Sequence, residues 1–332
     1  MALAWNQFRP PPSHPDRAGT DTEVSNVNDE QLLAELAPTA EALVERHIQQ
    51  AKEWFPHEIV PWERGPSVQP DRAWDPDEST IDERVRSAVI VNVLTEDNLP
   101  YYFRDIERMF GRTSIWGEWV RRWTAEEGRH SIALRDYLVL SRSVCPVELE
   151  RGRMAQIMAG EVPEPPDATH GFIYLTLQEL ATRIAHLNTG RLVDDDMGYQ
   201  VMKRVAADEN HHYLFYRDIA SAAIEADSSA AMIAIEHEVR NFEMPGTGIP
   251  DFIRHARAIR AAGIYDYVAH HDQILVPVVL RWWAIESLTG LSDEAEHARD
   301  RVIEYIARVG RVARRSAEQA EAAGNKRSAV TT

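Results

Sequence analysis

The chain has 332 residues, of which 44% are hydrophobic and 27% charged, a composition typical of a folded globular protein. Its net charge of −17 argues against non-specific binding to nucleic acid, and no uncharged apolar run approaches the ~20 residues of a membrane span. The one cysteine, Cys145, excludes an intramolecular disulfide, and the N-terminus lacks a signal-peptide core, so we expect a cytoplasmic location.

Apolar residues at helical spacing dominate the chain, and we therefore predict an all-α fold without strands. Residues 1–27 contain PPPSHP and many polar residues, which predicts a mobile arm. The first helix should begin after Asn28 and run toward Trp54. Residues 55–79 are rich in Pro and Trp without periodicity, which indicates an ordered connection wrapped on the rest of the fold.

A helix from about Asp82 should carry Glu96 and kink at Pro100, because proline disrupts helical hydrogen bonding. Further helices are predicted at 114–140, 146–159, 170–192, 196–225, 228–242, 250–262, 273–288 and 292–320. Residues 321–332 are polar and predict a disordered tail. Residues 28–320 are thus expected to form a single helical domain.

Two halves of the chain carry the same arrangement of carboxylates and imidazoles. In each half a single Glu is followed 30 or 31 residues later by a Glu-x-x-His pair, whose two members share one helix face. The six residues are Glu96, Glu127 and His130, then Glu179, Glu209 and His212. Four carboxylates and two imidazoles on four helices form the inward-facing ligand set of a di-iron or di-manganese four-helix bundle.

The composition predicts about one Glu-x-x-His match by chance, and the chain has a third in a polar segment, Glu294 and His297. The other two pairs lie on apolar stripes. Burying an unpaired carboxylate costs several kcal/mol, so four together require compensating charge. A metal pair supplies it, and buried Glu–Arg or Glu–His ion pairs are the alternative.

Four segments resemble the soluble acyl-[acyl-carrier-protein] desaturases, and in particular their actinobacterial branch. These segments are LTEDNLPYY at 94–102, RWTAEEGRH at 122–130, GFIYLTLQELATR at 171–183 and AADENHH at 206–212. The resemblance implies a ferritin-like four-helix bundle extended by additional helices, commonly a homodimer. It also implies that the six repeated residues bind two iron ions (Fe2+/Fe3+) per chain.

The same resemblance implies a function. The family uses a di-iron centre, reduced by a ferredoxin-type donor, to activate dioxygen and to introduce a cis double bond into a fatty acyl chain held on acyl carrier protein. Two alternatives stay open: a di-iron oxygenase or hydroxylase acting on a carrier-bound acyl chain, and a non-catalytic ferritin-like iron-binding protein. The chain length and the helices after residue 228 argue against the last.

An acidic residue directly precedes the second Glu of each half, namely Glu126 and Asp208. A metal-bound His usually donates its other N–H to a carboxylate. We therefore expect His130 to donate to Asp208, across the two halves, and His212 to donate to Glu126.

Two further residues correspond to functional positions of the family. Trp54 aligns with a tryptophan linked to electron transfer into the site, although an interfacial packing role is the alternative. Thr182 stands where the family has a hydroxyl near the oxygen-binding face, although such a Thr can also bond back to its own helix. His186 and His211 stay outside the predicted ligand set.

The substrate's length stays open. Candidate wall residues of the acyl tunnel, each of which could equally be ordinary core, are Phe103, Met109, Phe172, Leu175 and Leu187. Asp105 and Arg108 stand where the plant enzymes have less polar tunnel residues, so inward-facing side chains there would make a C16–C18 substrate doubtful.

Recognition of an acidic carrier protein would require a local basic patch on this acidic chain. The candidate clusters are Lys203 with Arg204, Arg254 with Arg257 and Arg260, and Arg311 with Arg314 and Arg315.

Overall fold

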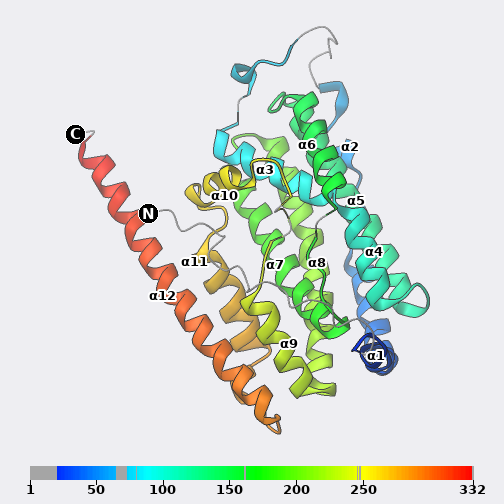
Figure 1. Ribbon diagram of the computed structural model, residues 1–332. Helices are drawn as coiled ribbons and strands as arrows, with labels where there is room; N and C mark the ends of the chain where they lie inside the picture. The colour runs from blue at the N-terminus through cyan, green and yellow to red at the C-terminus, as the bar shows by residue number, and fades with distance from the viewer. Residues whose placement is uncertain are drawn as a thin grey trace.

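The computed structural model describes residues 21–64, 73–79, 81–160, 162–244, 246 and 248–330, with the backbone alone for 21–28 and 320–330. In these residues the chain is helical and contains no strand (Figure 1). The prediction of an all-α fold is therefore confirmed.

Four long helices form the centre of the molecule. They are α3 (Glu83–Glu96), α5 (Ser114–Leu140), α7 (Ala168–Leu192) and α8 (Asp196–Ala226). Helices α3 and α8 each contact both α5 and α7, so the four helices close into a ring. Because each helix buries one face against its neighbours, the inward-facing residues of all four meet along one axis.

Gly190 lets α7 and α8 approach closely. A Cβ atom added there would lie 2.9 Å from the Cβ atom of Met202 in α8, nearer than side-chain atoms normally come. Carboxylate caps fix where these helices begin, since Asp167 accepts from the backbone N–H of His170 and Asp195 from that of Gly198. The start points set the register of the residues inside the ring.

The remaining helices cover the ring. They are α1 (Asp21–Gln50), α2 (Pro56–Ile59), η2 (Trp62–Arg64), η3 (Pro76–Glu78), α4 (Leu99–Phe110), α6 (Pro146–Ala159), α9 (Ser228–Arg240), α10 (Phe252–Ala261), α11 (Tyr267–His270), the π-helix η4 (His271–Trp282), η5 (Ile285–Ser287) and α12 (Asp293–Val330). Helix α1 packs on α8 and α5, which places its last turns next to the ring.

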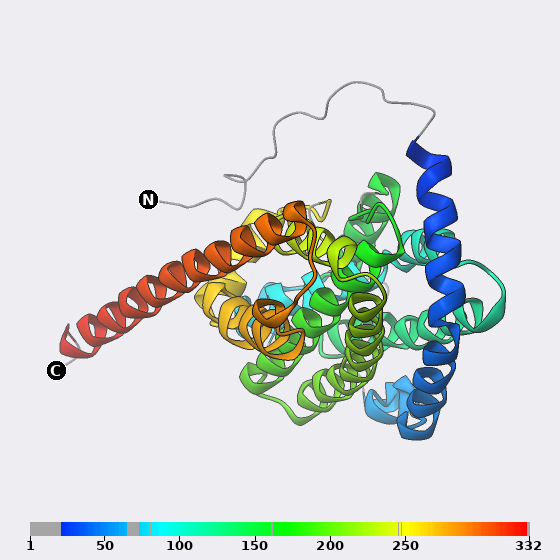
Figure 2. The same cartoon turned by 90° about the horizontal axis from the view of Figure 1, so that it is seen from below.

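Helix α12 packs by one apolar stripe and then leaves the bundle. Its buried residues recur every three or four positions, namely Ala295, Ala298, Val302, Ile306, Val309 and Ala313. They face α9 and η4, and beyond them the helix projects away from the other helices (Figure 2).

Some helices have the expected bounds and others do not. Those expected at 114–140 and 146–159 are found there. The first helix begins at Asp21 instead of after Asn28 and ends at Gln50, short of Trp54. The rest of the expected mobile arm, residues 1–20, lies outside the described residues.

The expected kink at Pro100 is a complete break. Helix α3 ends at Glu96, and α4 starts at Leu99 with Pro100 in its first turn. Proline lacks the N–H that an interior helical position needs, but in the first turn that N–H has no partner in any case. Glu96 consequently lies in the last turn of its helix.

The C-terminal third shows two further differences. The α-helix expected at 273–288 is replaced by a π-helix over His271–Trp282 with Pro277 inside it, followed by the short helix η5. The backbone of 321–330 continues α12, where a disordered tail was expected. Residues 314–330 are rich in Ala, Glu, Gln, Lys and Arg and contain no proline, which favours helix.

Membrane crossing requires a helix that is both long and apolar. None in the described part of the chain meets both requirements.

A buried carboxyl group between α1 and α7 yields a prediction about stability. Asp29 Oδ1 lies 3.3 Å from the backbone N of Ala168, and partial burial together with Asp167 raises the pKa of Asp29 to about 6. A carboxyl whose pKa is higher in the folded state destabilises the fold above that pKa, and the penalty vanishes below the unfolded value of 3.8. Asp29→Asn keeps the acceptor and should raise the free energy of unfolding by about 1 kcal/mol at pH near 7.5, in urea titrations.

At about pH 4.5 the gain in the free energy of unfolding should shrink to a third or less, because Asp29 is then largely protonated in the folded protein. Asp227→Asn, which changes the exposed N-cap carboxylate of α9, is the control. A gain at Asp29 that does not depend on pH would contradict this explanation.

Candidate metal centre

Six acidic and imidazole side chains meet inside the ring of four helices. They are Glu96 from α3, Glu127 and His130 from α5, Glu179 from α7, and Glu209 and His212 from α8. None is more than 6% exposed. The repeated pattern in the sequence therefore places all six in one buried cluster.

The potential ligand atoms form two overlapping groups, each with all its atoms within 4.8 Å of one another. Glu96 and His130 belong to one group, here named the first site; Glu179 and His212 belong to the other, the second site. Glu127 and Glu209 belong to both groups. Two cations could therefore be held side by side, one near Glu96 and His130 and the other near Glu179 and His212, with Glu127 and Glu209 within reach of both.

Several inward-facing atoms lack a hydrogen bond. They include Nδ1 of both His130 and His212, and one oxygen each of Glu127, Glu179 and Glu209. An unsatisfied buried polar group costs about 1–3 kcal/mol, more when charged. Cations at the two sites would satisfy these atoms together, so the donor set fits a pair of metal ions.

The electrostatics of the cluster also indicate missing positive charge. Burial raises the pKa of Glu96 and Glu209 well above the usual range, and the nearby Glu127 carboxylate raises both further. Burial alone would lower the pKa of His130, but attraction to Glu127 outweighs it and raises that pKa to about 10. In the absence of metal, bound protons therefore compensate the carboxylates, and cations would displace them.

Each imidazole turns its other nitrogen to a carboxylate outside the cluster. His130 Nε2 lies 3.5 Å from Asp208 Oδ2, and His212 Nε2 lies 2.9 Å from Glu126 Oε2. Both contacts cross between the two halves, as the sequence led us to expect. Such carboxylates fix the tautomer and orientation of metal-binding imidazoles.

Trp54 joins one of these outer carboxylates. Its Nε1 donates to Asp208 Oδ2 at 2.7 Å, and its ring stacks on that of His130 with a centroid separation of 6.5 Å. The guanidinium groups of Arg129 and Arg204 lie over the indole. Trp54 is thus connected through Asp208 to the His130 imidazole of the cluster.

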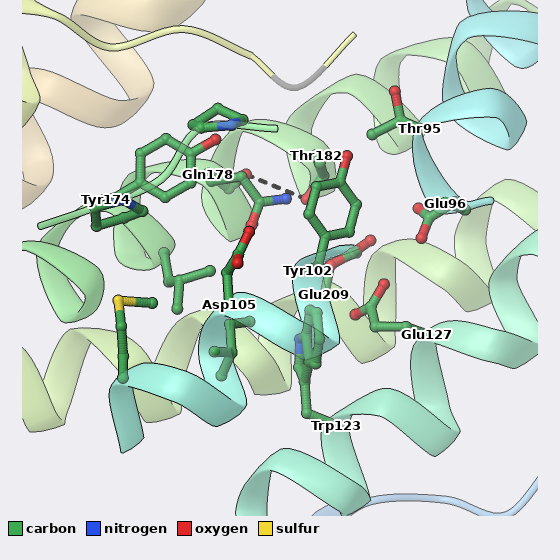
Figure 3. Close-up of a pocket in the computed structure, with 15 residues that line it drawn as sticks. Thr95, Glu96, Tyr102, Asp105, Trp123, Glu127, Tyr174, Gln178, Thr182 and Glu209 are labelled. Atoms are coloured by element: carbon green, nitrogen blue, oxygen red, sulfur yellow. Dashed lines mark hydrogen bonds between the residues drawn. The ribbon is translucent and has the colours of Figure 1, made fainter. Parts of the chain in front are cut away.

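Thr182 lies on the wall of a cavity beside the cluster. Its hydroxyl donates to the backbone oxygen of Gln178 at 3.2 Å (Figure 3) and to that of Glu179 at 3.0 Å, as the alternative interpretation of this residue expected. The same hydroxyl is therefore both bonded to its own helix and near the space where a substrate could lie.

The cavity extends from the acidic cluster between α4 and α7. Glu96 and Glu127 lie at one end, and Tyr174 and Asp105 lie toward the other (Figure 3). Its apolar wall includes Ile106.

Of the candidate wall residues, two line this cavity, Met109 and Leu175, and three do not, Phe103, Phe172 and Leu187. Phe172 is instead stacked on Phe110 within the core. Asp105 faces the cavity and is held by a two-pronged ion pair with Arg104, whereas Arg108 is exposed.

Two buried histidines near the cluster were not predicted to contribute. His186 Nε2 lies 3.5 Å from Glu96 Oε1, and burial lowers the pKa of His186 to about 3, so it is a neutral neighbour of the first site. His47 of α1 shares Glu126 with His212. No repeat or motif marks His47, because it lies alone on an outer helix.

Other acidic and imidazole side chains gather outside the cluster. His170, His237 and Glu238 could approach one cation, but the His237 side chain is half exposed. The third Glu-x-x-His pair, Glu294 and His297, is exposed, as expected for a chance match.

The sequence matches a family model described as fatty acid desaturase over residues 28–331. A Mycobacterium tuberculosis protein named acyl-[acyl-carrier-protein] desaturase DesA1 is 42% identical over 272 residues, which are 79% of this chain and 80% of that protein. Rice chloroplastic acyl-[acyl-carrier-protein] desaturase 7 is 30% identical over 318 residues, covering 87% of this chain and 76% of the rice protein.

A solved structure supports the fold. The X-ray structure of DesA2 from Mycobacterium tuberculosis matches 78% of this chain and 97% of its own with a TM-score of 0.65, at 24% identity. The ferritin-like helical fold expected from the sequence is therefore confirmed.

The shared ligands predict unequal effects of single substitutions. In anaerobic titrations with Co2+, followed by visible absorption, the protein should bind two cations. Glu96→Ala should lower the Co2+ affinity of the first site by about 100-fold or more, and Glu179→Ala that of the second. Glu127→Ala should lower the affinity of both sites.

Glu294→Ala is the matched control, since it removes the Glu of the exposed pair, and it should bind as the unchanged protein does. Normal binding of two cations by Glu127→Ala would contradict the shared arrangement.

Proposed function

Because the chain belongs to the fatty acid desaturase family, we propose that it is an acyl-[acyl-carrier-protein] desaturase, an oxidoreductase that introduces a cis double bond into a fatty acyl chain carried on acyl carrier protein. The observation that supports this most directly is the cavity that opens on the carboxylate cluster. It places a partly apolar space beside a candidate pair of metal sites.

We assign two iron ions per chain, Fe2+ or Fe3+, to the first and second sites. Carboxylate oxygens and imidazole nitrogens suit iron, and no thiolate lies in the cluster. When bound, the iron pair supplies dioxygen activation. Removing two hydrogens while reducing dioxygen to two waters consumes two further electrons and two protons, so an external electron donor is required.

The protein positions the acyl chain and protects the site from water. Leu175 and Ile106 supply apolar wall, and Trp123 fixes the second site by donating its Nε1 hydrogen to Glu179 Oε1 at 3.0 Å. The Thr182 hydroxyl stands on the same wall, and rotation away from its backbone acceptors would let it donate to an oxygen atom near the cluster. We propose this positioning as its role.

The electron route is proposed to run through Trp54 and Asp208 to His130. Trp54 follows α1 in a segment whose neighbours Lys52 and Glu53 are exposed, so a donor protein can approach. The hydrogen bond from the indole to Asp208 provides a contiguous path to a ligand imidazole. We propose a ferredoxin-type donor on this side.

The carrier protein is proposed to dock on the α10 arginines. Arg254, Arg257 and Arg260 are all exposed and recur every third residue. Of the other clusters, Arg204 is committed to Asp208 and lies over Trp54. These three arginines would give an acidic carrier protein a local positive surface on a chain whose net charge of −17 would otherwise repel it. A homodimer and a cytoplasmic location complete the proposal.

The position of Asp105 bears on which acyl chains the cavity could accept. Because Asp105 faces the cavity, a standard C16–C18 chain would meet an ion pair along its path. A panel of chain lengths therefore belongs in any activity assay.

Mass spectrometry of the acyl carrier protein tests the reaction. After incubation with iron-loaded protein, ferredoxin, its reductase, NADPH and dioxygen, an acyl chain should lose two hydrogens, and Glu127→Ala should abolish the loss. Gain of one oxygen atom would assign the protein to the oxygenases instead. No product from any chain length, with two irons bound, would contradict the proposed substrate.

Substitution of Trp54 should separate reduction from metal binding. In Trp54→Phe, reduction of the iron-loaded protein by ferredoxin should slow by at least about tenfold, because the hydrogen-bonded path to Asp208 is lost. Rates are compared at equal iron occupancy, and reduction by dithionite with a mediator should stay unchanged, as stopped-flow absorbance would show.

Trp62→Phe is the matched control, since Trp62 is exposed in the same segment and donates to Asp136. Equal slowing in both variants would exclude a specific route through Trp54.

A further inference from the structure

His47 is a buried imidazole on a helix outside the ring. It lies in the last turn of α1 and is only 4% exposed. Two aromatic rings pack against the His47 imidazole. The Trp119 ring stands edge-on to it with a centroid separation of 5.1 Å, and the His212 ring is nearly parallel to it at 5.8 Å. Tight packing of this kind holds the imidazole in one orientation.

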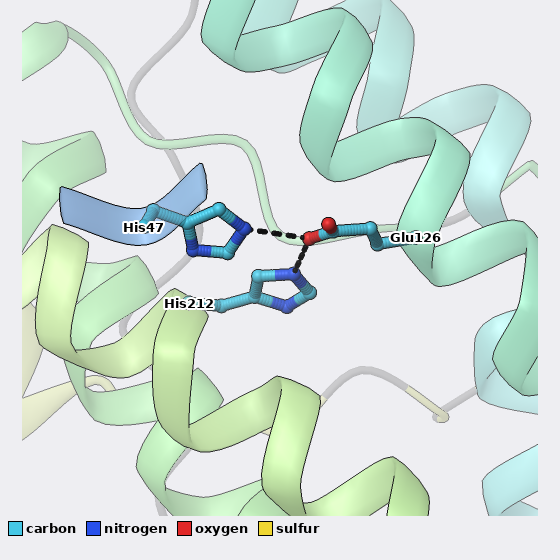
Figure 4. A group of neighbouring side chains, drawn as sticks. All are labelled: His47, Glu126 and His212. Carbon is cyan, nitrogen blue, oxygen red and sulfur yellow. Dashed lines mark hydrogen bonds and ion pairs between the residues drawn. The ribbon is translucent and has the colours of Figure 1, made fainter. Parts of the chain in front are cut away.

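His47 and the ligand His212 share one carboxylate oxygen. The Nε2 atoms of both imidazoles lie 2.9 Å from Glu126 Oε2 (Figure 4). An ionised carboxylate only accepts hydrogen bonds, so both imidazoles carry a hydrogen on Nε2. Nδ1 of His212, which faces Glu127 Oε1 at 2.8 Å, is thereby available to bind a cation at the second site.

The charge state of Glu126 agrees with this arrangement. Burial alone would raise its pKa, but the hydrogen bonds from His212 and His47 hold the pKa of Glu126 well below its usual range. The other oxygen accepts from Arg122 at 2.5 Å. Both oxygens of the Glu126 carboxylate, which orients His212, thus accept hydrogen bonds from side chains.

The other half of the molecule has a matching arrangement around Asp208. Asp208 orients His130 and accepts from Arg204, four residues earlier in its helix, as Glu126 accepts from Arg122, four residues earlier in its own. Asp208 also accepts from Arg129 and from the indole of Trp54. His47 occupies the equivalent position on Glu126, seven residues before Trp54 in the chain.

We propose that His47 is a positioning residue of the second site. Its Nε2 hydrogen fixes Glu126, and Glu126 in turn holds His212 with Nδ1 directed at the cation. The assignment rests on the metal pair of the proposed function. Loss of a residue that acts on a metal-binding imidazole in this way costs 10–100-fold in metal affinity in other proteins.

Two substitutions separate this role from simple packing. His47→Gln can keep an N–H donor toward Glu126, whereas His47→Leu keeps apolar volume without a donor. In anaerobic Co2+ titrations, His47→Leu should weaken the second site by about 10–100-fold and leave the first site unchanged. His47→Gln should bind within about threefold of the unchanged protein, and the visible spectrum of the second Co2+ should change only in His47→Leu.

His211→Leu is the matched control, because His211 is the other imidazole beside His47, with rings 5.9 Å apart, and is not one of the two on Glu126. An unchanged first site also verifies that His47→Leu is folded. Normal second-site affinity in His47→Leu, or equal weakening by Gln and Leu, would overturn the proposal.

This experiment is independent of the desaturation assay. If the unchanged protein binds two Co2+ and His47→Leu loses one, the role of His47 is supported even when no unsaturated product forms. If product forms while His47→Leu binds both cations normally, the proposed function is supported and the role of His47 is not.

Discussion

Mutual repulsion among the carboxylates of Glu96, Glu127, Glu179 and Glu209 is the constraint on which the rest of the structure depends. All four are buried within one ring of helices, where each isolated charge would cost several kcal/mol. Imidazoles compensate part of this charge, and burial beside Glu127 raises the pKa of Glu96 and Glu209, so these two carboxyl groups favour bound protons until cations replace them. The fold therefore has to supply positive charge next to the four buried carboxylates.

The helices outside the ring contribute to that solution. Glu126 and Asp208 orient the two ligand imidazoles. His47 of α1 contacts Glu126, and Trp54, in the segment after α1, donates a hydrogen bond to Asp208. The two partners differ chemically, because an indole is suited to electron transfer and an imidazole to a fixed polar contact. A bundle of four helices alone would leave both outer carboxylates without these donors.

The sequence predicted those features that repeat or that follow helical periodicity. The six cluster residues were found because both halves carry them at nearly equal spacing, and α5 and α6 because their apolar stripes are regular. His47 could not be found, since a single polar residue in an outer helix resembles any surface histidine. The inward direction of Asp105 and the π-helix around Pro277 depend on packing between distant segments, which no local pattern contains.

The most direct test of the account is an anomalous-difference map at the iron absorption edge, from crystals loaded anaerobically with Fe2+. The account predicts two neighbouring peaks inside the ring, each beside Nδ1 of His130 or His212, with Glu127 and Glu209 between them. Iron at His170 and His237 instead, or one peak placed away from both imidazoles, would contradict the central claim that the buried carboxylates exist to hold a metal pair.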